Sequence, residues 1–253
     1  MSQLTSHDIA KMIDHSLLHP TLTDDRLREG CELARTYDVA SCCVKPYHTR
    51  LAAECLAGSD VLVCTVVNFP HGNNPTDLKV AETEHVIDEG ATEIDLVANI
   101  GKVCQGDWDY VEKDLGAVAE LCHSRDARLK VIFAVDFLAD DRIAELTRVC
   151  NRVRADWVKT STGFNYVKDA DGRMAYQGAT DRALKIMADN VADGVQVKAA
   201  GKTRTVERIL EIREAYKVTR VGASSTAQIM EAARRLLDGL EGADVGEADP
   251  SAY

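Results

Sequence analysis

The sequence lacks the features that mark membrane and secreted proteins. Its longest apolar runs, such as residues 61–67 and 131–135, are far shorter than the roughly 20 residues that cross a bilayer. Residues 1–15 contain no apolar stretch of the kind found in signal peptides. We therefore expect a cytoplasmic protein without a membrane-spanning segment.

Signatures of nucleotide and metal binding are also missing. There is no G-x-x-x-x-G-K-[ST] loop and no G-x-G-x-x-G fingerprint, which disfavours an NTPase or a Rossmann dehydrogenase. The 7 histidines include no H-E-x-x-H or other metal-binding spacing, so we expect no metal and no cofactor. The 8 cysteines form no C-x-x-C pair, and several have apolar neighbours, which favours buried, reduced thiols.

Positive charge is scarce relative to negative charge. Lys and Arg total 30 against 41 Asp and Glu, which gives a net charge of −11. An acidic chain repels phosphate backbones at long range, so general binding of nucleic acid or of anionic membranes is disfavoured. A small local phosphate site is compatible with this balance.

The sequence does contain an alternation of short β-branched runs with longer amphipathic segments. One helix is expected from near Thr23, with Leu27, Cys31 and Ala34 on one face, and another from Thr205. Eight strand-like runs alternate with such segments, and the first of them could instead be a helix end. The runs are residues 12–18, 40–44, 61–67, 93–98, 130–135, 157–160, 195–199 and 220–222.

Eight units in 253 residues average about 32 residues each, close to the length of a βαβ unit. This pattern predicts a single-domain α/β fold, a (β/α)8 TIM barrel over residues 1–237, with a doubly wound open sheet as the alternative. The acidic, glycine-rich residues 238–253 predict a mobile tail. Residues 165–177 predict an exposed excursion, and the Asp171-Gly172 pair within it indicates a small hairpin.

Two lysines stand at the carboxyl ends of expected strands, where the active sites of barrels are built. Lys159 and Lys198 each follow apolar strand residues and precede small ones. If both point into the barrel, they repel each other, and this repulsion favours a neutral, nucleophilic amine on one of them. The alternatives are a structural ion pair or an outward orientation.

Glu93 and Asp95 lie two residues apart, so they share one face of an expected strand. Asp95 has apolar neighbours and is the better candidate to face the lysines, with Glu93 one layer lower. A carboxylate beside a lysine could equally form a buried salt bridge.

Small residues follow three of the expected strands, at Gly163 and in residues 201–205 and 221–225. The last two segments precede helices, and the loops after strands 7 and 8 are the usual phosphate site of this barrel. Lys202 and Arg204 could add positive charge there. Taken one at a time, the glycines read as ordinary turn residues.

These residues occur in an order that resembles the class I deoxyribose-phosphate aldolases, barrel enzymes of deoxynucleoside catabolism. The resemblance runs from Ile13 to about Ile229. The matching segments are residues 13–18, 63–72, 93–97, 158–164, 197–201 and 220–225.

The resemblance implies a lyase that forms a Schiff base and reversibly cleaves 2-deoxyribose 5-phosphate to glyceraldehyde 3-phosphate and acetaldehyde. It implies that Lys159 is the nucleophile, that Lys198 is the second lysine, and that Asp95 is the acid that works with an ordered water. The positions that it places near the substrate or its phosphate are Asp14, Cys43, Thr160, Gly163, Gly201, Arg204, Gly222, Ser224 and Ser225. A homodimer is expected by analogy.

The sequence departs from the family pattern around the substrate end. Lys202 replaces a usual glycine, Ala134-Val135 replaces a usual Glu-Thr pair, and Thr226 stands where glycine is common. The segment 165–177 is longer than in many members, and Tyr253 only weakly resembles a terminal tyrosine of some members. A related aldolase with another substrate, or a non-catalytic phosphosugar-binding barrel, therefore remain as alternatives.

Overall fold

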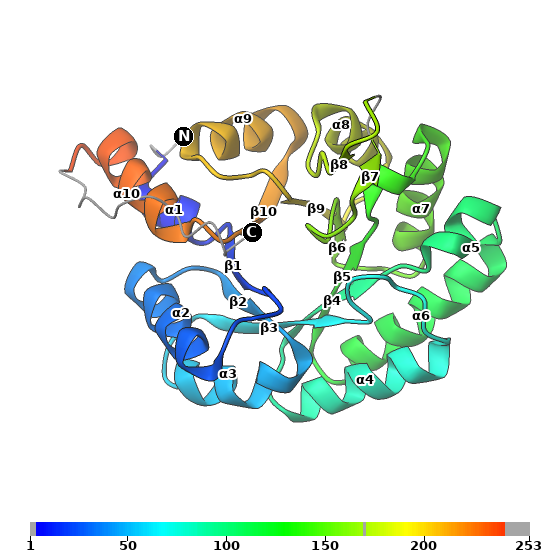
Figure 1. Cartoon of the computed structure of the whole chain (residues 1–253), viewed down its shortest axis with the longest axis horizontal. Coiled ribbons are helices and arrows are strands. Elements are labelled where there is room, and N and C mark those ends of the chain that lie inside the picture. Colours follow the sequence, from blue (N-terminus) through cyan, green and yellow to red (C-terminus); the bar gives the residue numbers. More distant parts are fainter. Residues whose placement is uncertain (1–3, 169–170, 241–253) are drawn as a thin grey trace.

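The computed structural model describes residues 4–168 and 171–240, and its core is a closed barrel of parallel strands (Figure 1). The hydrogen-bonded order is β1-β10-β9-β6-β5-β4-β3-β2. The predicted barrel is therefore confirmed, and the open-sheet alternative is wrong. The strands are β1 (Ile13–Leu17), β2 (Ser41–Val44), β3 (Leu62–Val67), β4 (Glu93–Val97), β5 (Arg128–Ile132), β6 (Trp157–Lys159), β9 (Gln196–Ala200) and β10 (Val218–Ala223).

Helices surround this barrel on its outside (Figure 1). The described helices are α1 (Ser6–Ala10), α2 (Asp24–Tyr37), α3 (Thr49–Leu56), α4 (Thr76–Asp88), α5 (Ile100–Gln105), α6 (Trp108–Ser124), α7 (Asp140–Arg152), α8 (Asp181–Asn190), α9 (Val206–Tyr216) and α10 (Thr226–Leu237). Short 3-10 turns, η1 (Pro46–His48) and η2 (Val135–Phe137), follow β2 and β5. None of the helices within these described residues is long and apolar enough to cross a membrane.

The expected helix starts are found at their threonine caps. The side chain of Thr23 accepts a hydrogen bond from the Arg26 amide at the start of α2, and Thr205 does the same for Arg208 in α9. The apolar face of α2 is buried as its spacing predicted, and its Leu27 is fully buried. Such faces pack against the outward residues of the strands and form the main hydrophobic core.

The first of the eight predicted runs is a strand, and the alternative of a helix end is wrong, since β1 pairs with both β2 and β10. The boundary of the fifth strand differs from the sequence prediction. The fifth strand ends at Ile132, whereas the apolar run continued to residue 135. Ala134 adopts a left-handed conformation with φ 51°, which ends the strand and leads into η2. Ala134 and Val135 therefore lie beyond the strand to which the sequence assigned them.

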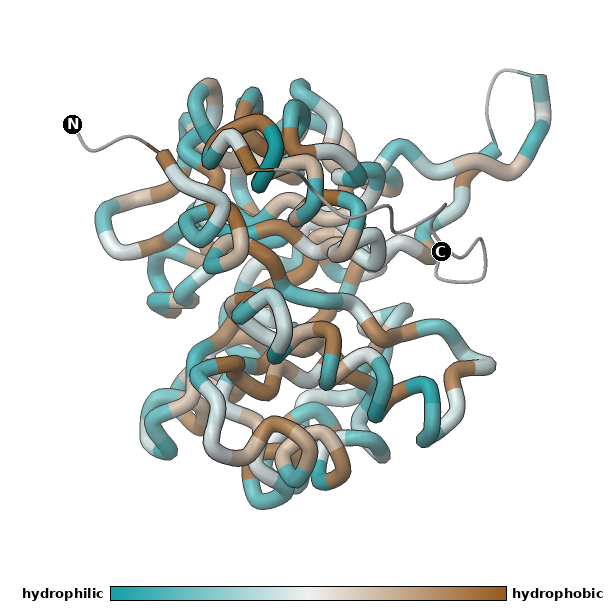
Figure 2. The backbone as a smooth tube through the Cα atoms, turned by 90° about the vertical axis from the view of Figure 1, so that its left-hand side faces the viewer, coloured by the Kyte–Doolittle hydropathy of each residue, from teal (hydrophilic) through white to brown (hydrophobic). Residues whose placement is uncertain are grey.

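The excursion after β6 contains the expected hairpin. Strands β7 (Val167–Lys168) and β8 (Met174–Ala175) pair in antiparallel fashion. Figure 2 shows this segment, interrupted by a short grey trace, extending away from the body of the barrel. Helix α10 ends at Leu237, and most of the expected tail, including Tyr253, lies outside the described residues. The mobile tail therefore stays a prediction.

All of the cysteines are free thiols, as expected. Cys31, Cys42, Cys43, Cys64, Cys122 and Cys150 are buried, Cys55 is half-buried and Cys104 is exposed. Two of the buried thiols, Cys43 and Cys64, point into the barrel with Leu18 and Val66 and form a small second apolar cluster. This cluster lies next to the polar residues described below.

Candidate active site

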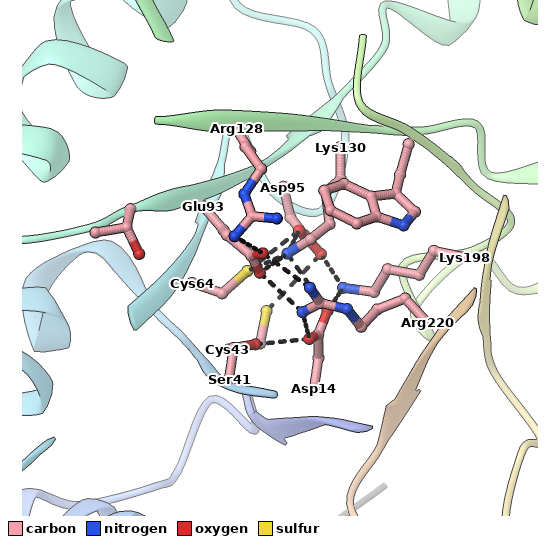
Figure 3. A network of polar contacts seen from close by, with 12 residues as sticks. Asp14, Ser41, Cys43, Cys64, Glu93, Asp95, Arg128, Lys130, Lys198 and Arg220 are labelled. Carbon is pink, nitrogen blue, oxygen red and sulfur yellow. Dashed lines mark hydrogen bonds and ion pairs between the residues drawn. The ribbon is translucent and has the colours of Figure 1, made fainter. Parts of the chain in front are cut away.

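Charged side chains from six strands meet inside the barrel (Figure 3). Because side chains alternate along a strand, the residues that do not face the helices must face the barrel interior. The interior set comprises three carboxylates and four cations, each at most 7% exposed. They are Asp14, Glu93, Asp95, Lys130, Lys159, Lys198 and Arg220.

The two sequence-predicted lysines and Asp95 are in direct contact. Lys159 and Lys198 are register partners on the adjacent strands β6 and β9. Oδ2 of Asp95 lies 2.6 Å from Nζ of Lys159 and 2.7 Å from Nζ of Lys198. One carboxylate oxygen therefore holds both amines, and the alternative in which the lysines face outward is wrong.

A second set of contacts extends this cluster through the barrel. Asp14 accepts hydrogen bonds from Ser41 Oγ at 2.7 Å and from Nη1 of Arg220 at 2.6 Å, and it lies 2.5 Å from Nζ of Lys198. Glu93 accepts hydrogen bonds from both terminal nitrogens of Arg220, at 3.0 and 3.1 Å, and lies 2.6 Å from Nζ of Lys130. Glu93 thus faces the barrel, as the two-residue spacing predicted.

Mutual attraction keeps Asp95 and Lys198 ionised despite their burial. Burial alone would raise the pKa of Asp95, but Lys130, Lys159 and Lys198 hold it well below its usual range. Burial would likewise lower the pKa of Lys198, yet Asp14 and Asp95 raise it above its ordinary value. Lys198 is therefore an ammonium ion beside Lys159.

The barrel also contains groups that could ligate a cation. Sγ of Cys64 and oxygens of Asp14 and Glu93 lie within 4.8 Å of one another, as do ligand atoms of Cys43, Cys64 and Asp95. Lys130 already provides a cation there, because its ammonium lies 3.1 Å from Sγ of Cys64, 2.6 Å from Glu93 and 3.1 Å from Asp95. Cys43, a predicted substrate contact, has its Sγ 3.9 Å from Asp95.

Sequence reasoning missed Lys130 and Arg220 as members of this site. Both stand at the start of the runs from which strands were predicted, so they appeared to mark strand boundaries. Period-two alternation with Ile132 and Gly222 was the signal that could have found them.

One predicted substrate residue is engaged elsewhere. The hydroxyl of Thr160 donates to the carbonyl of Ala200 at 2.8 Å and accepts from the Ala200 amide at 2.9 Å. Thr160 therefore joins the ends of β6 and β9, and its hydroxyl is used in that link. The predicted contact with substrate does not follow from this arrangement.

The predicted phosphate-site residues lie in or next to three loops at the same end of the barrel. Gly163 follows β6, Gly201 and Arg204 follow β9, and Gly222 is near the end of β10. Gly163 and Gly201 have positive φ angles of 84° and 88°, and Arg204 is exposed. The remaining two predicted residues are Ser224, which is half-buried, and Ser225, which is the N-cap residue of α10.

Thr226, the residue found in place of a common glycine, is fully buried at the first position of α10. Its hydroxyl lies 2.8 Å from Nδ1 of His15. Burial lowers the pKa of His15 to about 4, and only a backbone hydrogen bond to Ala223 opposes this effect. His15 is therefore neutral and links β1 to the start of α10.

This burial makes stability depend on pH. The unfolded chain takes up a proton at His15 below pH ~6.5, whereas the folded chain resists until about pH 4. The stability that the neutral histidine contributes is thus lost as pH falls from ~6.5 towards 4. Between pH 7 and pH 4.5, we expect the wild type to lose about 2 to 3 kcal/mol more free energy of unfolding than His15→Asn. Urea titrations at both pH values measure this difference, and equal losses would contradict it.

The sequence is similar to those of known aldolases. A family model described as DeoC/LacD family aldolase matches residues 9–230. The chain belongs to this aldolase family. A deoxyribose-phosphate aldolase of Rhodopirellula baltica is 41% identical over 253 residues and covers all of both chains. One from Caldanaerobacter subterraneus subsp. tengcongensis is 40% identical and aligns over 88% of this chain and 93% of its own.

Solved structures of related aldolases have the same fold. The deoxyribose phosphate aldolase of Aeropyrum pernix, described as having a unique tetrameric structure, superposes with a TM-score of 0.81 at 26% identity. The match covers 92% of this chain and 93% of that one. An aldolase named QR15 gives a TM-score of 0.79 at 30% identity, over 88% and 95% of the two chains. The homodimer expected from the sequence stays a prediction.

Proposed function

We propose that this member of the family is a class I aldolase that reversibly cleaves 2-deoxyribose 5-phosphate to glyceraldehyde 3-phosphate and acetaldehyde. The observation that supports it most directly is the contact of one buried carboxylate, Asp95, with two lysines of adjacent strands. This is the arrangement that Schiff-base chemistry requires, since a neutral amine must form beside a group that accepts and returns protons.

Lys159 is the nucleophile in this proposal. Of the three interior lysines, Lys130 and Lys198 are completely buried, whereas Lys159 keeps 4% of its surface exposed. Lys159 also has a single carboxylate partner, Asp95, while each of the others contacts at least two acids. It is therefore the interior amine that is most accessible to a substrate and that has the fewest ion pairs to break.

The proposed reaction begins when the Lys159 amine adds to the aldehyde carbon of the open-chain sugar. Loss of water gives an iminium ion, which is an electron sink. Removal of the C3 hydroxyl proton then breaks the C2–C3 bond, releases glyceraldehyde 3-phosphate and leaves an enamine. Protonation of the enamine and hydrolysis free acetaldehyde and Lys159. Asp95, Lys198 and water move the protons in this scheme.

In this proposal the substrate phosphate lies at the loops after β9 and β10. These are the loops that bind phosphate in barrels of this kind, and the second of them leads into the N-terminus of α10. Asp14 and Cys43 lie close to the reacting amines, which is consistent with contacts to the substrate. Breakdown of deoxynucleotides in the cytoplasm is the setting that this reaction suggests.

Trapping of the covalent intermediate tests the proposal. The protein is incubated with 2-deoxyribose 5-phosphate, reduced with borohydride and weighed intact, and peptide mapping then locates the adduct. We expect a single adduct on Lys159 that is missing from Lys159→Ala. No adduct from folded protein, with either this substrate or acetaldehyde, would refute the proposal and favour a non-catalytic barrel.

A related aldolase activity on another aldehyde is the second candidate. It is favoured by the additional hairpin β7–β8 and by Lys202, whose Nζ lies 5.6 Å from the centre of the Tyr176 ring in that segment. A panel of phosphorylated and free aldehydes separates the two candidates. Equal or better turnover without the phosphate would contradict the phosphate-site assignment.

A further inference from the structure

A single carboxylate holds both ends of the hairpin segment that follows the Lys159 loop. Asp136 lies in η2, directly after β5. Its Oδ2 accepts a hydrogen bond from Nδ2 of Asn165, before β7, and its Oδ1 accepts one from the amide of Gln177 at 2.5 Å, after β8. The Gly178 amide lies 3.4 Å from both oxygens. Asp136 thus fixes where the hairpin leaves the barrel and where it returns.

The amide of Asn165 carries this contact to the loop after the proposed nucleophile. Asn165 is 2% exposed. Its Oδ1 accepts hydrogen bonds from Oγ of Ser161 at 2.6 Å and from the amide and hydroxyl of Thr162 at 3.3 and 3.0 Å. Ser161 and Thr162 follow Lys159 by two and three residues. Every polar atom of the Asn165 side chain therefore joins the hairpin base to this loop.

The returning end of the hairpin packs against the loop after β9. A Cβ on Gly178 would lie 2.8 Å from the carbonyl oxygen of Gly201, and a Cβ on Gly201 would lie 3.2 Å from the ring of Tyr176. Such a close approach requires glycine on both sides. The ammonium of Lys202 lies 5.6 Å from the Tyr176 ring centre, within the range of a cation–π contact. The hairpin thus provides an aromatic contact for the ammonium of Lys202.

We propose that Asp136 and Asn165 are positioning residues through which this aldolase selects phosphorylated over unphosphorylated substrates. Together they hold Tyr176, and through it Lys202, at the end of the barrel where the substrate phosphate would lie. Lys202 supplies a positive charge at the loop position where a glycine is usual, and where the glycine backbone would approach the phosphate. This inference rests on the proposed function.

The direction of the hydrogen bonds gives a sharp test. In Asp136→Asn, one rotamer of the new amide places its NH2 against the NH2 of Asn165, and the other places it against the Gln177 amide. In Asn165→Asp, two carboxylates face each other. The double variant exchanges amide and carboxylate, so that every donor again meets an acceptor. A loss in each single variant and recovery in the double variant would show that the two side chains act through their contact with each other.

The measurement is kcat/KM for 2-deoxyribose 5-phosphate divided by kcat/KM for free 2-deoxyribose. We expect each single variant to lower this ratio by roughly tenfold, through a higher KM for the phosphorylated substrate. The double variant should return the ratio to within about threefold of the wild-type value. Asp193→Asn, which changes an exposed carboxylate ahead of β9, should leave the ratio unchanged.

An unchanged ratio in both single variants would overturn the inference, as would a double variant that is no better than either. Equal losses for both substrates would also overturn it, because they would indicate general disorder of the site. The wild type is trapped with borohydride beforehand. If the aldolase proposal fails, no adduct forms. If only this inference fails, the adduct forms but the two single substitutions leave the kcat/KM ratio unchanged.

Discussion

Replacing Lys159 by methionine is expected to lower kcat/KM for 2-deoxyribose 5-phosphate by on the order of 10⁴-fold or more, without destabilising the barrel. The loss of activity follows from removal of the amine that would form the iminium. Retention of stability follows from the charges inside the barrel. Three carboxylates there face Lys130, Lys159, Lys198 and Arg220, so full ionisation leaves one cation in excess.

Removing Lys159 leaves three cations facing three carboxylates inside the barrel. Asp95 keeps ion pairs with Lys198 at 2.7 Å and with Lys130 at 3.1 Å, so no carboxylate is left alone. We therefore expect the free energy of unfolding of Lys159→Met to lie within about 1 kcal/mol of the wild-type value.

Lys130→Met is the matched control. It removes the same charge from the same barrel, but Lys130 contacts Asp14, Glu93 and Asp95 together. Loss of this shared partner should cost about 3 to 5 kcal/mol of unfolding free energy. Urea titration measures both variants. Both substitutions balance the charge, so similar destabilisation by the two would contradict the expectation that the number of ion pairs lost decides stability. Retained turnover in Lys159→Met would contradict the nucleophile assignment.

The hydrophobic pattern predicted the barrel and the strands that carry Lys159 and Lys198. Lys159 and Lys198 could be recognised because each follows an apolar strand and precedes small residues. Their meeting depends on a register that a sequence does not show, yet an eightfold strand–helix alternation makes neighbouring strands parallel and their ends coincide.

There are physical reasons why some residues of the site and one strand end could not be predicted from the sequence. Arg220 and Lys130 are charged residues at the start of apolar runs, a position usually exposed to solvent, and only the complete set of partners stabilises them inside. The end of β5 was missed because Ala134 is apolar and small, and its side chain does not indicate a left-handed conformation. The role of Asp136 depends on a hairpin that returns to it from about forty residues away.

Asp95→Asn is the second substitution with a large expected effect. Oδ2 of Asp95 contacts both Lys159 and Lys198, and its Oδ1 accepts from Cys64 and lies 3.1 Å from Lys130. An asparagine presents its NH2 group to an ammonium in either orientation, and it cannot take up a proton. We expect kcat for cleavage of 2-deoxyribose 5-phosphate to fall by roughly 10²- to 10⁴-fold.

Glu93→Gln separates this effect from the loss of one buried negative charge. Glu93 contacts three cations, Lys130, Arg220 and Arg128, and its amide variant likewise places an NH2 group against one of them. Both variants should therefore lose comparable unfolding free energy in urea. Only Asp95→Asn should lose most of its kcat, because only Asp95 contacts the amine that would form the Schiff base. Equal losses of kcat in the two variants, at equal stability, would show that Asp95 acts through the charge balance of the barrel and not through proton transfer.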